Sequence, residues 1–84
     1  MSFSVYILRC ADASFYIGVT NDLEKRLHAH NNLKSGARYT KARRPVTLVY
    51  HEDGMTQSTA LKREWNLKAL SRKEKIALIE KQSD

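Results

Sequence analysis

The sequence predicts a small α+β fold: a three-stranded antiparallel sheet flanked by three helices, in the order β-β-α-β-α-α. Two β-rich runs separated by a short polar stretch open the chain, which is the pattern of a β-hairpin. A third β-rich run follows a proline, and three amphipathic segments with helix-start signals occupy most of the remainder. With 84 residues, the chain (1–84) is expected to form a single domain.

The predicted hairpin joins residues 3–10 to residues 15–19, both rich in β-branched and aromatic residues. The expected loop, residues 11–13, is a type I turn followed by a bulge. The bulge requires positive φ at Ala13, a conformation that costs alanine more than glycine. Because the first run is apolar at successive positions, we expect it to be the central strand, with helices covering the sheet.

The hairpin register decides whether its two tyrosines meet. A three-residue loop closes on a pair of Cys10 and Ser14, which sets Tyr6 opposite Gly18 and turns Tyr16 to the same face. A loop of two or four residues would put the tyrosines on opposite faces. In the expected register, Gly18 leaves a gap beside the Tyr6 ring through which a substrate could approach the backbone.

The first helix is predicted over residues 22–32, after the start signal Thr20-Asn21-Asp22. Leu23, Leu27 and His30 form its apolar stripe, and Arg26 borders that stripe. A strand follows at 46–51, with a turn at 52–54.

The last two helices are predicted at 56–70 and 72–81, the second beginning with a capping box of Ser71 and Glu74. Their apolar positions share helical spacing and are expected to pack on the sheet. These positions are Ala60, Leu61, Trp65, Leu67, Leu70, Ile76, Leu78 and Ile79.

Composition favours a polyanionic partner. The sequence has fifteen Lys and Arg residues and nine Asp and Glu residues, which gives a net charge of +6. A basic but inert surface is the alternative. The single cysteine, Cys10, lies among apolar neighbours and predicts a buried free thiol, which suits a reducing cytoplasm. No apolar run approaches the length of a membrane span, so no membrane partner is expected.

Residues 33–44 are predicted to form a basic loop that contacts nucleic acid. Basic side chains alternate there with a tyrosine, a composition that suits a phosphate backbone and base stacking. An ordinary solvated loop is the alternative. The residues expected to bind nucleic acid are Lys34, Arg38, Tyr39, Lys41, Arg43 and Arg44.

Glu64 is the most unusual residue of the helix predicted at 56–70, because its spacing places a carboxylate on or beside the buried face. An ion pair with Arg26 or a nearby lysine would explain it, as would a side chain reaching to solvent. A divalent-metal ligand is the functional interpretation. Arg26 could equally brace a carboxylate or clamp a phosphate. His30 alone is more typical of a hydrogen-bonded core residue than of a catalyst.

Taken together, these residues resemble the GIY-YIG nuclease family. Ser4-Val5-Tyr6 and Tyr16-Ile17-Gly18 resemble its paired tripeptides, although the first lacks the Gly-Ile. Arg26 and Glu64 match its helical arginine and glutamate. The chain is most similar to small stand-alone bacterial members, which carry a Gly-Ala-Arg-Tyr-Thr stretch like residues 36–40.

The resemblance implies a metal-dependent endonuclease that hydrolyses phosphodiester bonds in DNA, including branched, flapped or damaged DNA in repair or recombination. Glu64 would bind Mg²⁺ or Mn²⁺. Tyr6 would act as general base or proton relay, and Tyr16 would orient the water or phosphate. Arg26 would stabilise transition-state charge, and His30 would assist proton transfer. A nearby metal and Arg26 are expected to lower the pKa of Tyr6.

Two other interpretations remain open. The chain could be a non-catalytic DNA-binding module on the same scaffold, or an accessory domain that binds a repair protein. Val19, where several relatives have lysine, and the lack of asparagine after residue 70 are consistent with altered activity. The sequence favours no particular oligomeric state.

Overall fold

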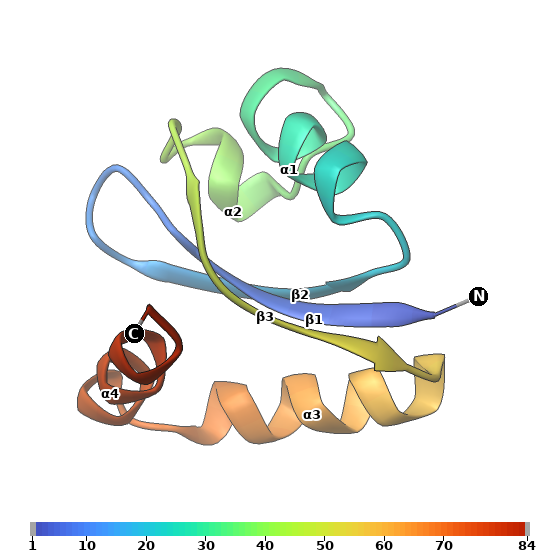
Figure 1. Ribbon diagram of the computed structural model, residues 1–84. Helices are drawn as coiled ribbons and strands as arrows, with labels where there is room; N and C mark the ends of the chain where they lie inside the picture. Colours follow the sequence, from blue (N-terminus) through green and yellow to red (C-terminus); the bar gives the residue numbers. More distant parts are fainter. Residues whose placement is uncertain (1, 84) are drawn as a thin grey trace.

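A three-stranded antiparallel sheet in the order β2-β1-β3 forms the centre of the computed structural model, which describes residues 2–83. The elements are β1 (Phe3–Arg9), β2 (Phe15–Thr20), α1 (Leu23–Asn32), α2 (Arg38–Lys41), β3 (Thr47–Met55), α3 (Gln57–Ala69) and α4 (Arg72–Ser83). Figure 1 shows α1 and α2 on one side of the sheet and α3 and α4 on the other. The predicted α+β class, strand–helix order and central first strand are therefore confirmed.

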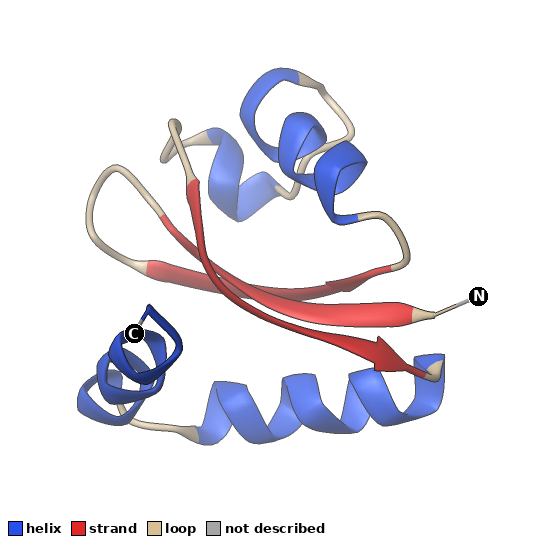
Figure 2. Ribbon diagram, viewed as in Figure 1, coloured by secondary structure: helices blue, strands red, loops and turns tan. Residues whose placement is uncertain are grey.

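The segment expected to be a basic loop contains one turn of helix, α2, which Figure 2 shows between α1 and β3. Four residues are too few to produce a periodic apolar pattern, so the sequence showed no helical signal there. Within the described residues, none of the helices is long and apolar enough to cross a membrane.

The hairpin forms in the predicted register. The Cys10 amide donates to the Ser14 carbonyl at 2.8 Å, and Ala13 adopts a φ of 69°. Tyr6 pairs with Gly18, so both tyrosines of the hairpin share one face of the sheet. Cys10 is buried and unpaired, as expected. Local turn chemistry thus sets the relative positions of Tyr6, Tyr16 and Gly18.

The turn predicted at 52–54 is wrong, because β3 continues through these residues to Met55. Phe3 pairs with Met55 but Val5 pairs with a residue three positions earlier, which is a β-bulge. Gly54 supplies a φ of 74° there and has open space where a side chain would be. The Asp-Gly pair that predicted a turn instead lies in this bulge, where the glycine adopts the positive φ.

Alternate residues of β1 build two separate cores. One core lies against α3 and consists of Val5, Ile7, Ile17, Tyr50 and Leu67. The other lies against α1 and consists of Tyr6, Leu8, Cys10 and Val46, with Tyr16, Leu23, Leu27 and Leu48 packed on it. The sheet therefore carries its hairpin tyrosines on the α1 face.

The helix boundaries follow their predicted capping signals. The Asp22 side chain accepts from the Lys25 amide at 3.1 Å, which starts α1. Ser71 and Glu74 form the predicted capping box at the start of α4. Thr56 caps α3 through the Thr59 amide in the same way.

The predicted apolar faces of α3 and α4 were too wide. Ala60 and Leu67 are fully buried, whereas Leu61 is 49% exposed and Trp65 is 77% exposed. At about 100° per residue, Trp65 lies about 140° around the helix from Ala60. Ile76 of α4 is likewise exposed, and Leu78 and Ile79 pack that helix against the core.

Candidate active site

A chain of buried hydrogen bonds joins β1, α1 and α2. The Tyr6 hydroxyl lies 2.8 Å from His30 Nε2, and His30 Nδ1 lies 2.8 Å from Thr40 Oγ1. The Thr40 hydroxyl donates to the Ala37 carbonyl at 2.9 Å. Because that hydroxyl has one proton, it accepts from His30 Nδ1–H. His30 Nε2 then accepts the hydrogen bond from the Tyr6 hydroxyl. Each of the three side chains in this hydrogen-bond chain therefore has a partner.

Close packing between two segments brings Thr40 to His30. A Cβ atom at Gly36 would lie 2.5 Å from the Ala29 carbonyl oxygen of α1, so only glycine permits this approach. Ala37 follows in an extended conformation and precedes α2. Thr40, on α2, is completely buried.

Burial dominates the titration of the site. It raises the pKa of Tyr6 to about 12, against the lowering effect of the nearby Arg26 guanidinium, while Tyr16 and Glu64 raise it further. Burial also lowers the pKa of His30 to about 4, with help from the positive charges of Arg26 and Arg44. Arg26 thus acts on the Tyr6 pKa in the expected direction, but desolvation outweighs it and the net change is upward.

The gap expected beside Gly18 is filled by Tyr6 itself. A Cβ atom on Gly18 would lie 2.5 Å from the Tyr6 hydroxyl oxygen. Since Gly18 belongs to the edge strand β2, the tyrosine side chain crosses that strand and places its hydroxyl above the backbone. The glycine thus positions the hydroxyl and leaves no space there for a substrate.

Tyr16 extends the site through ring contacts. Its ring centroid lies 5.0 Å from that of His30 and 6.5 Å from that of Tyr6. On the other side of the site, the Tyr39 ring stacks with Tyr16 at 6.1 Å, and the Arg43 guanidinium lies 3.9 Å from the Tyr39 centroid. Tyr39 therefore connects α2 to Tyr16 through contacts within the protein.

Arg26 borders the site from α1, as its spacing predicted. It is half-buried and donates through Nη1 to the Ser35 carbonyl at 2.9 Å. Its charge acts on both Tyr6 and His30. Its guanidinium has five N–H groups, so donors remain for an anion beyond the bonds that it makes within the protein.

Glu64 belongs to α3, on the opposite face of the sheet, yet its charge acts on Tyr6. Its side chain is 22% exposed and forms an ion pair with Lys68 at 3.4 Å. Within residues 2–83, no three His, Cys, Asp or Glu side chains cluster as metal ligands. One loosely paired carboxylate suits Mg²⁺, which commonly binds one or two carboxylates together with waters and substrate phosphate.

The basic residues expected to bind nucleic acid fall into two groups. Lys34, Arg38 and Lys41 are exposed around α2. Arg43 pairs with Asp12 at 3.0 Å, and Arg44 donates to three carbonyls at the end of α1. These bonds give Arg43 and Arg44 structural roles that the sequence did not reveal.

The fold and this site define the chain as a member of the GIY-YIG family. The model of the GIY-YIG catalytic domain matches residues 2–77. A UPF0213 protein of Staphylococcus saprophyticus is 53% identical over 75 residues, covering 89% of this chain and 90% of the relative. A UPF0213 protein of Clostridium perfringens is 51% identical over 79 residues, covering 94% and 84%.

Two solved structures are similar in fold. The solution structure of a UPF0213 protein from Bacillus halodurans has a TM-score of 0.60 at 38% identity, covering 95% of this chain and 84% of that one. The solution structure of a protein from E. faecalis has a TM-score of 0.64 at 37% identity, covering 100% and 90%. This chain is thus similar to small bacterial proteins of nearly its own length.

Thr40 is the site residue that sequence reasoning missed as a candidate. It lies in the Gly-Ala-Arg-Tyr-Thr stretch, residues 36–40, which did carry part of the family resemblance. The structure gives this stretch a physical meaning: Gly36 allows the close approach, Tyr39 stacks on Tyr16, and Thr40 binds His30.

Proposed function

We propose that this chain is a divalent-metal-dependent endonuclease that hydrolyses phosphodiester bonds in DNA, including branched, flapped or damaged forms. The observation that carries the proposal is the hydrogen-bond chain from Tyr6 through His30 to Thr40, with Tyr16 beside it. Arg26 and Glu64 act electrostatically on the same tyrosine. A buried proton-transfer chain with convergent charges is the usual arrangement of an acid–base site.

In this mechanism Tyr6 relays a proton to His30. A tyrosine with a pKa of about 12 stays protonated at neutral pH and cannot accept a proton unless it gives one up. Tyr6 passes its proton to the free Nε2 of His30 as it takes one from the attacking water. The new bond joins the water oxygen to phosphorus, and the bond from phosphorus to the leaving oxygen breaks. The leaving oxygen takes its proton from solvent.

The low pKa of His30 makes the relay reversible. With a pKa of about 4, the protonated imidazole returns its proton readily, so the neutral form is restored for the next turnover. Tyr16 orients the water or the phosphate from beside the His30 ring, and Arg26 stabilises the negative charge that develops on the phosphate oxygens. Glu64 would hold Mg²⁺ or Mn²⁺, and the metal would supply positive charge to the phosphate and to the leaving oxygen.

The test is a cleavage assay on single-stranded, duplex, flapped and branched DNA with Mg²⁺ or Mn²⁺. Glu64→Gln and Tyr6→Phe are compared with Glu80→Gln, an exposed glutamate of α4 that gives the same charge change as Glu64→Gln. We expect each site variant to cut about 10²–10⁴-fold more slowly while still binding DNA, and Glu80→Gln to match the parent protein. Unimpaired cutting by Glu64→Gln would overturn the metal assignment.

A non-catalytic DNA-binding or repair-accessory module is the second candidate. The observation that favours it is the Glu64–Lys68 ion pair, in which a lysine already neutralises the proposed metal ligand. On this hypothesis the parent protein binds DNA with no metal-dependent cleavage of any substrate in the panel. Binding without any cutting in the presence of Mg²⁺ or Mn²⁺ would therefore select the module.

A further inference from the structure

A groove runs beside the edge strand β2 and continues from the candidate active site. It has a volume of about 280 Å³ and is lined by Phe15, Tyr16, Ile17, Tyr39, Lys68 and Lys75. Three β2 residues form its floor, while α2 contributes one side chain and the two C-terminal helices contribute the lysines. Tyr16 belongs to both the groove and the site, so a strand lying in the groove would contact the residue whose ring packs against Tyr6 and His30.

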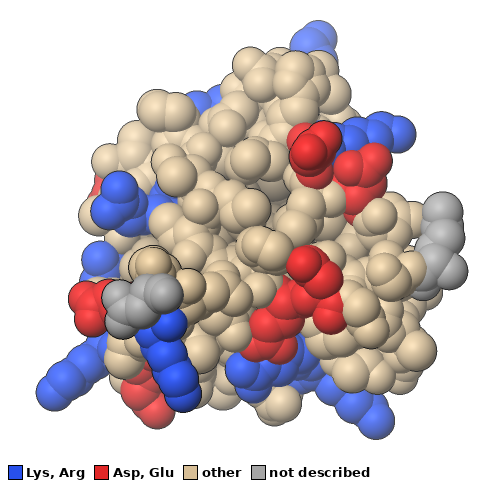
Figure 3. Space-filling model, viewed as in Figure 1, with Lys and Arg blue, Asp and Glu red and all other residues tan. Residues whose placement is uncertain are grey.

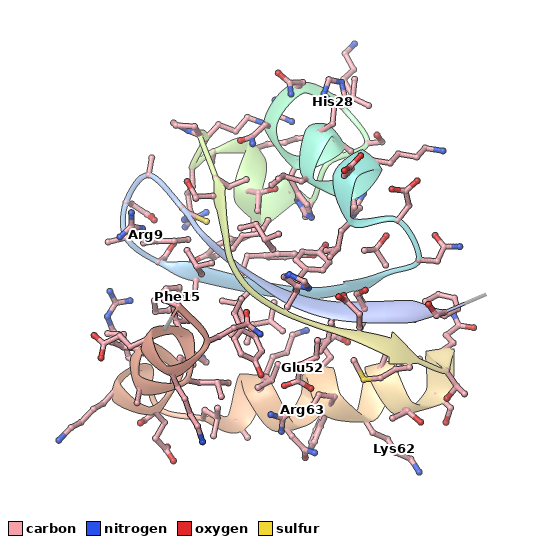
Figure 4. The ribbon with its side chains drawn as sticks, viewed as in Figure 1. Arg9, Phe15, His28, Glu52, Lys62 and Arg63 are labelled. Carbon is pink, nitrogen blue, oxygen red and sulfur yellow. The ribbon has the colours of Figure 1, made fainter. Side chains whose placement is uncertain are left out.

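The charge of the groove is positive. Its lining has two lysines and no acidic residue. The Arg72 guanidinium lies 4.8 Å from the ring centroid of Phe15, and Figure 4 places Phe15 close to α4. Figure 3, which views the molecule as in Figure 1, shows acidic side chains over β3, the opposite edge strand, with basic side chains directly beside them. Glu52 of β3 is paired with Arg63, whereas the charged residues that line the groove are both basic.

The groove combines these lysines with aromatic rings. Tyr39 is 39% exposed, and Phe15 and Tyr16 are partly exposed. Proteins that hold single-stranded nucleic acid use this combination, in which basic side chains follow the phosphates and aromatic rings contact the bases. The groove thus has a tyrosine of α2 on one border and lysines of α3 and α4 on the other.

We propose that this groove binds one unpaired DNA strand next to the bond to be cut, with Lys68 and Lys75 on its phosphates. The proposal rests on the proposed function only in placing the strand beside a reacting bond, since strand binding can occur without cleavage. Lys68 also pairs with Glu64, so a phosphate that draws this lysine into the groove frees the carboxylate for a metal. Unpaired strands are what flapped and branched DNA supply.

The test measures binding of a short fluorescent single-stranded DNA, and of a duplex of the same length, as a function of salt. Lys75→Ala is compared with Lys62→Ala, an exposed α3 lysine outside the groove that gives the same change in charge. For Lys75→Ala we expect a several-fold higher Kd for the single strand and a salt slope shallower by about 0.7. Lys62→Ala and the duplex should show little change.

Two results would overturn the groove assignment. One is equal weakening by Lys62→Ala and Lys75→Ala, which would mean that net charge alone governs binding. The other is unchanged single-strand binding by Lys75→Ala. Lys75→Gln, which keeps more of the side-chain stem, replaces Lys75→Ala if that variant fails to fold. All variants are measured with Glu64→Gln added, so that loss of binding is separated from loss of cleavage.

Discussion

The two faces of the sheet differ in the chemistry that they bury. The face against α3 buries mainly aliphatic side chains, with Val5, Ile7 and Leu67 fully enclosed. The face against α1 buries a chain of polar groups, Tyr6, His30 and Thr40, each nearly or fully shielded from solvent. Both faces take alternate residues of the same strand, β1.

Because successive side chains of a strand point to opposite faces, β1 can place its stabilising apolar residues on one face and the polar residues of the candidate site on the other. Buried apolar side chains stabilise the fold without constraint on hydrogen bonding. Buried polar side chains stabilise it only when every donor finds an acceptor, so they fix orientation as well. The α3 face therefore tolerates changes of shape, whereas the α1 face demands particular atoms at particular distances.

Truncating adjacent residues of β1 would sharpen this comparison. We expect Ile7→Ala and Leu8→Ala each to lower the free energy of unfolding by about 2–5 kcal/mol, because both side chains are fully buried. Cleavage per folded molecule should persist in Ile7→Ala but fall in Leu8→Ala by up to about 10²-fold, since Leu8 pairs with Tyr16. Urea unfolding and the cleavage assay measure the two effects.

Equal losses of activity in the two variants would contradict the separation of the faces. Ile7→Val, which is expected to cost about 0.5–1.5 kcal/mol, serves if the alanine variants are too unstable to assay.

Acidification should weaken the α1 face first. The pKa of His30 is about 4 in the folded protein and near 6.5 in the unfolded chain. Between these values the unfolded state binds more protons, so stability present above pH 6.5 is lost as the pH falls to 4. The full contribution is roughly 3 kcal/mol. Urea unfolding from pH 8 to 4 measures it.

Replacing the histidine isolates this effect from the carboxylates that titrate in the same range. His30→Gln should flatten the stability profile between pH 6.5 and 4. His28→Gln, at an exposed position of α1, is the matched control for the loss of one histidine. A profile as steep in His30→Gln as in the parent protein would exclude His30 as the source.

The smallest expected effect concerns the hydroxyl of Thr40. Thr40→Val keeps the shape but removes the acceptor of His30 Nδ1–H, which should cost about 1–3 kcal/mol of stability. Nitrogen NMR should then show a changed proportion of the two neutral forms of His30, and cleavage should slow. Thr40→Ser keeps the hydroxyl and should show the parent proportion of the two neutral forms and the parent cleavage rate. If Thr40→Ser instead shows the NMR signature of Thr40→Val, Thr40 acts only through packing.

Sequence reasoning succeeded where the determinants were local. The hairpin register followed from a three-residue loop, and the starts of α1 and α4 followed from their capping residues. The family resemblance identified Tyr6 and Glu64 as candidates from short motifs and their order along the chain. Their proposed roles, by contrast, rest on contacts with other segments.

What the sequence could not predict depends on contacts between distant segments. Thr40 reaches His30 only because Gly36 allows one backbone to approach another. Arg44 was expected to bind a phosphate, but it donates to backbone carbonyls at the end of α1. The sequence does not predict this contact, because residue spacing does not show where backbone carbonyls gather. The pKa of Tyr6 depends on the extent of its burial, which a strand pattern does not measure.

The Tyr6 hydroxyl lies where any side chain at position 18 would have to begin. The two positions therefore cannot drift independently over generations. An alanine at 18 would be accepted only after residue 6 had become smaller, and a smaller residue 6 would remove the hydroxyl. In a lineage that has lost the tyrosine at position 6, we expect other residues to be tolerated at position 18. The residue at either position therefore indicates whether selection still acts on the other.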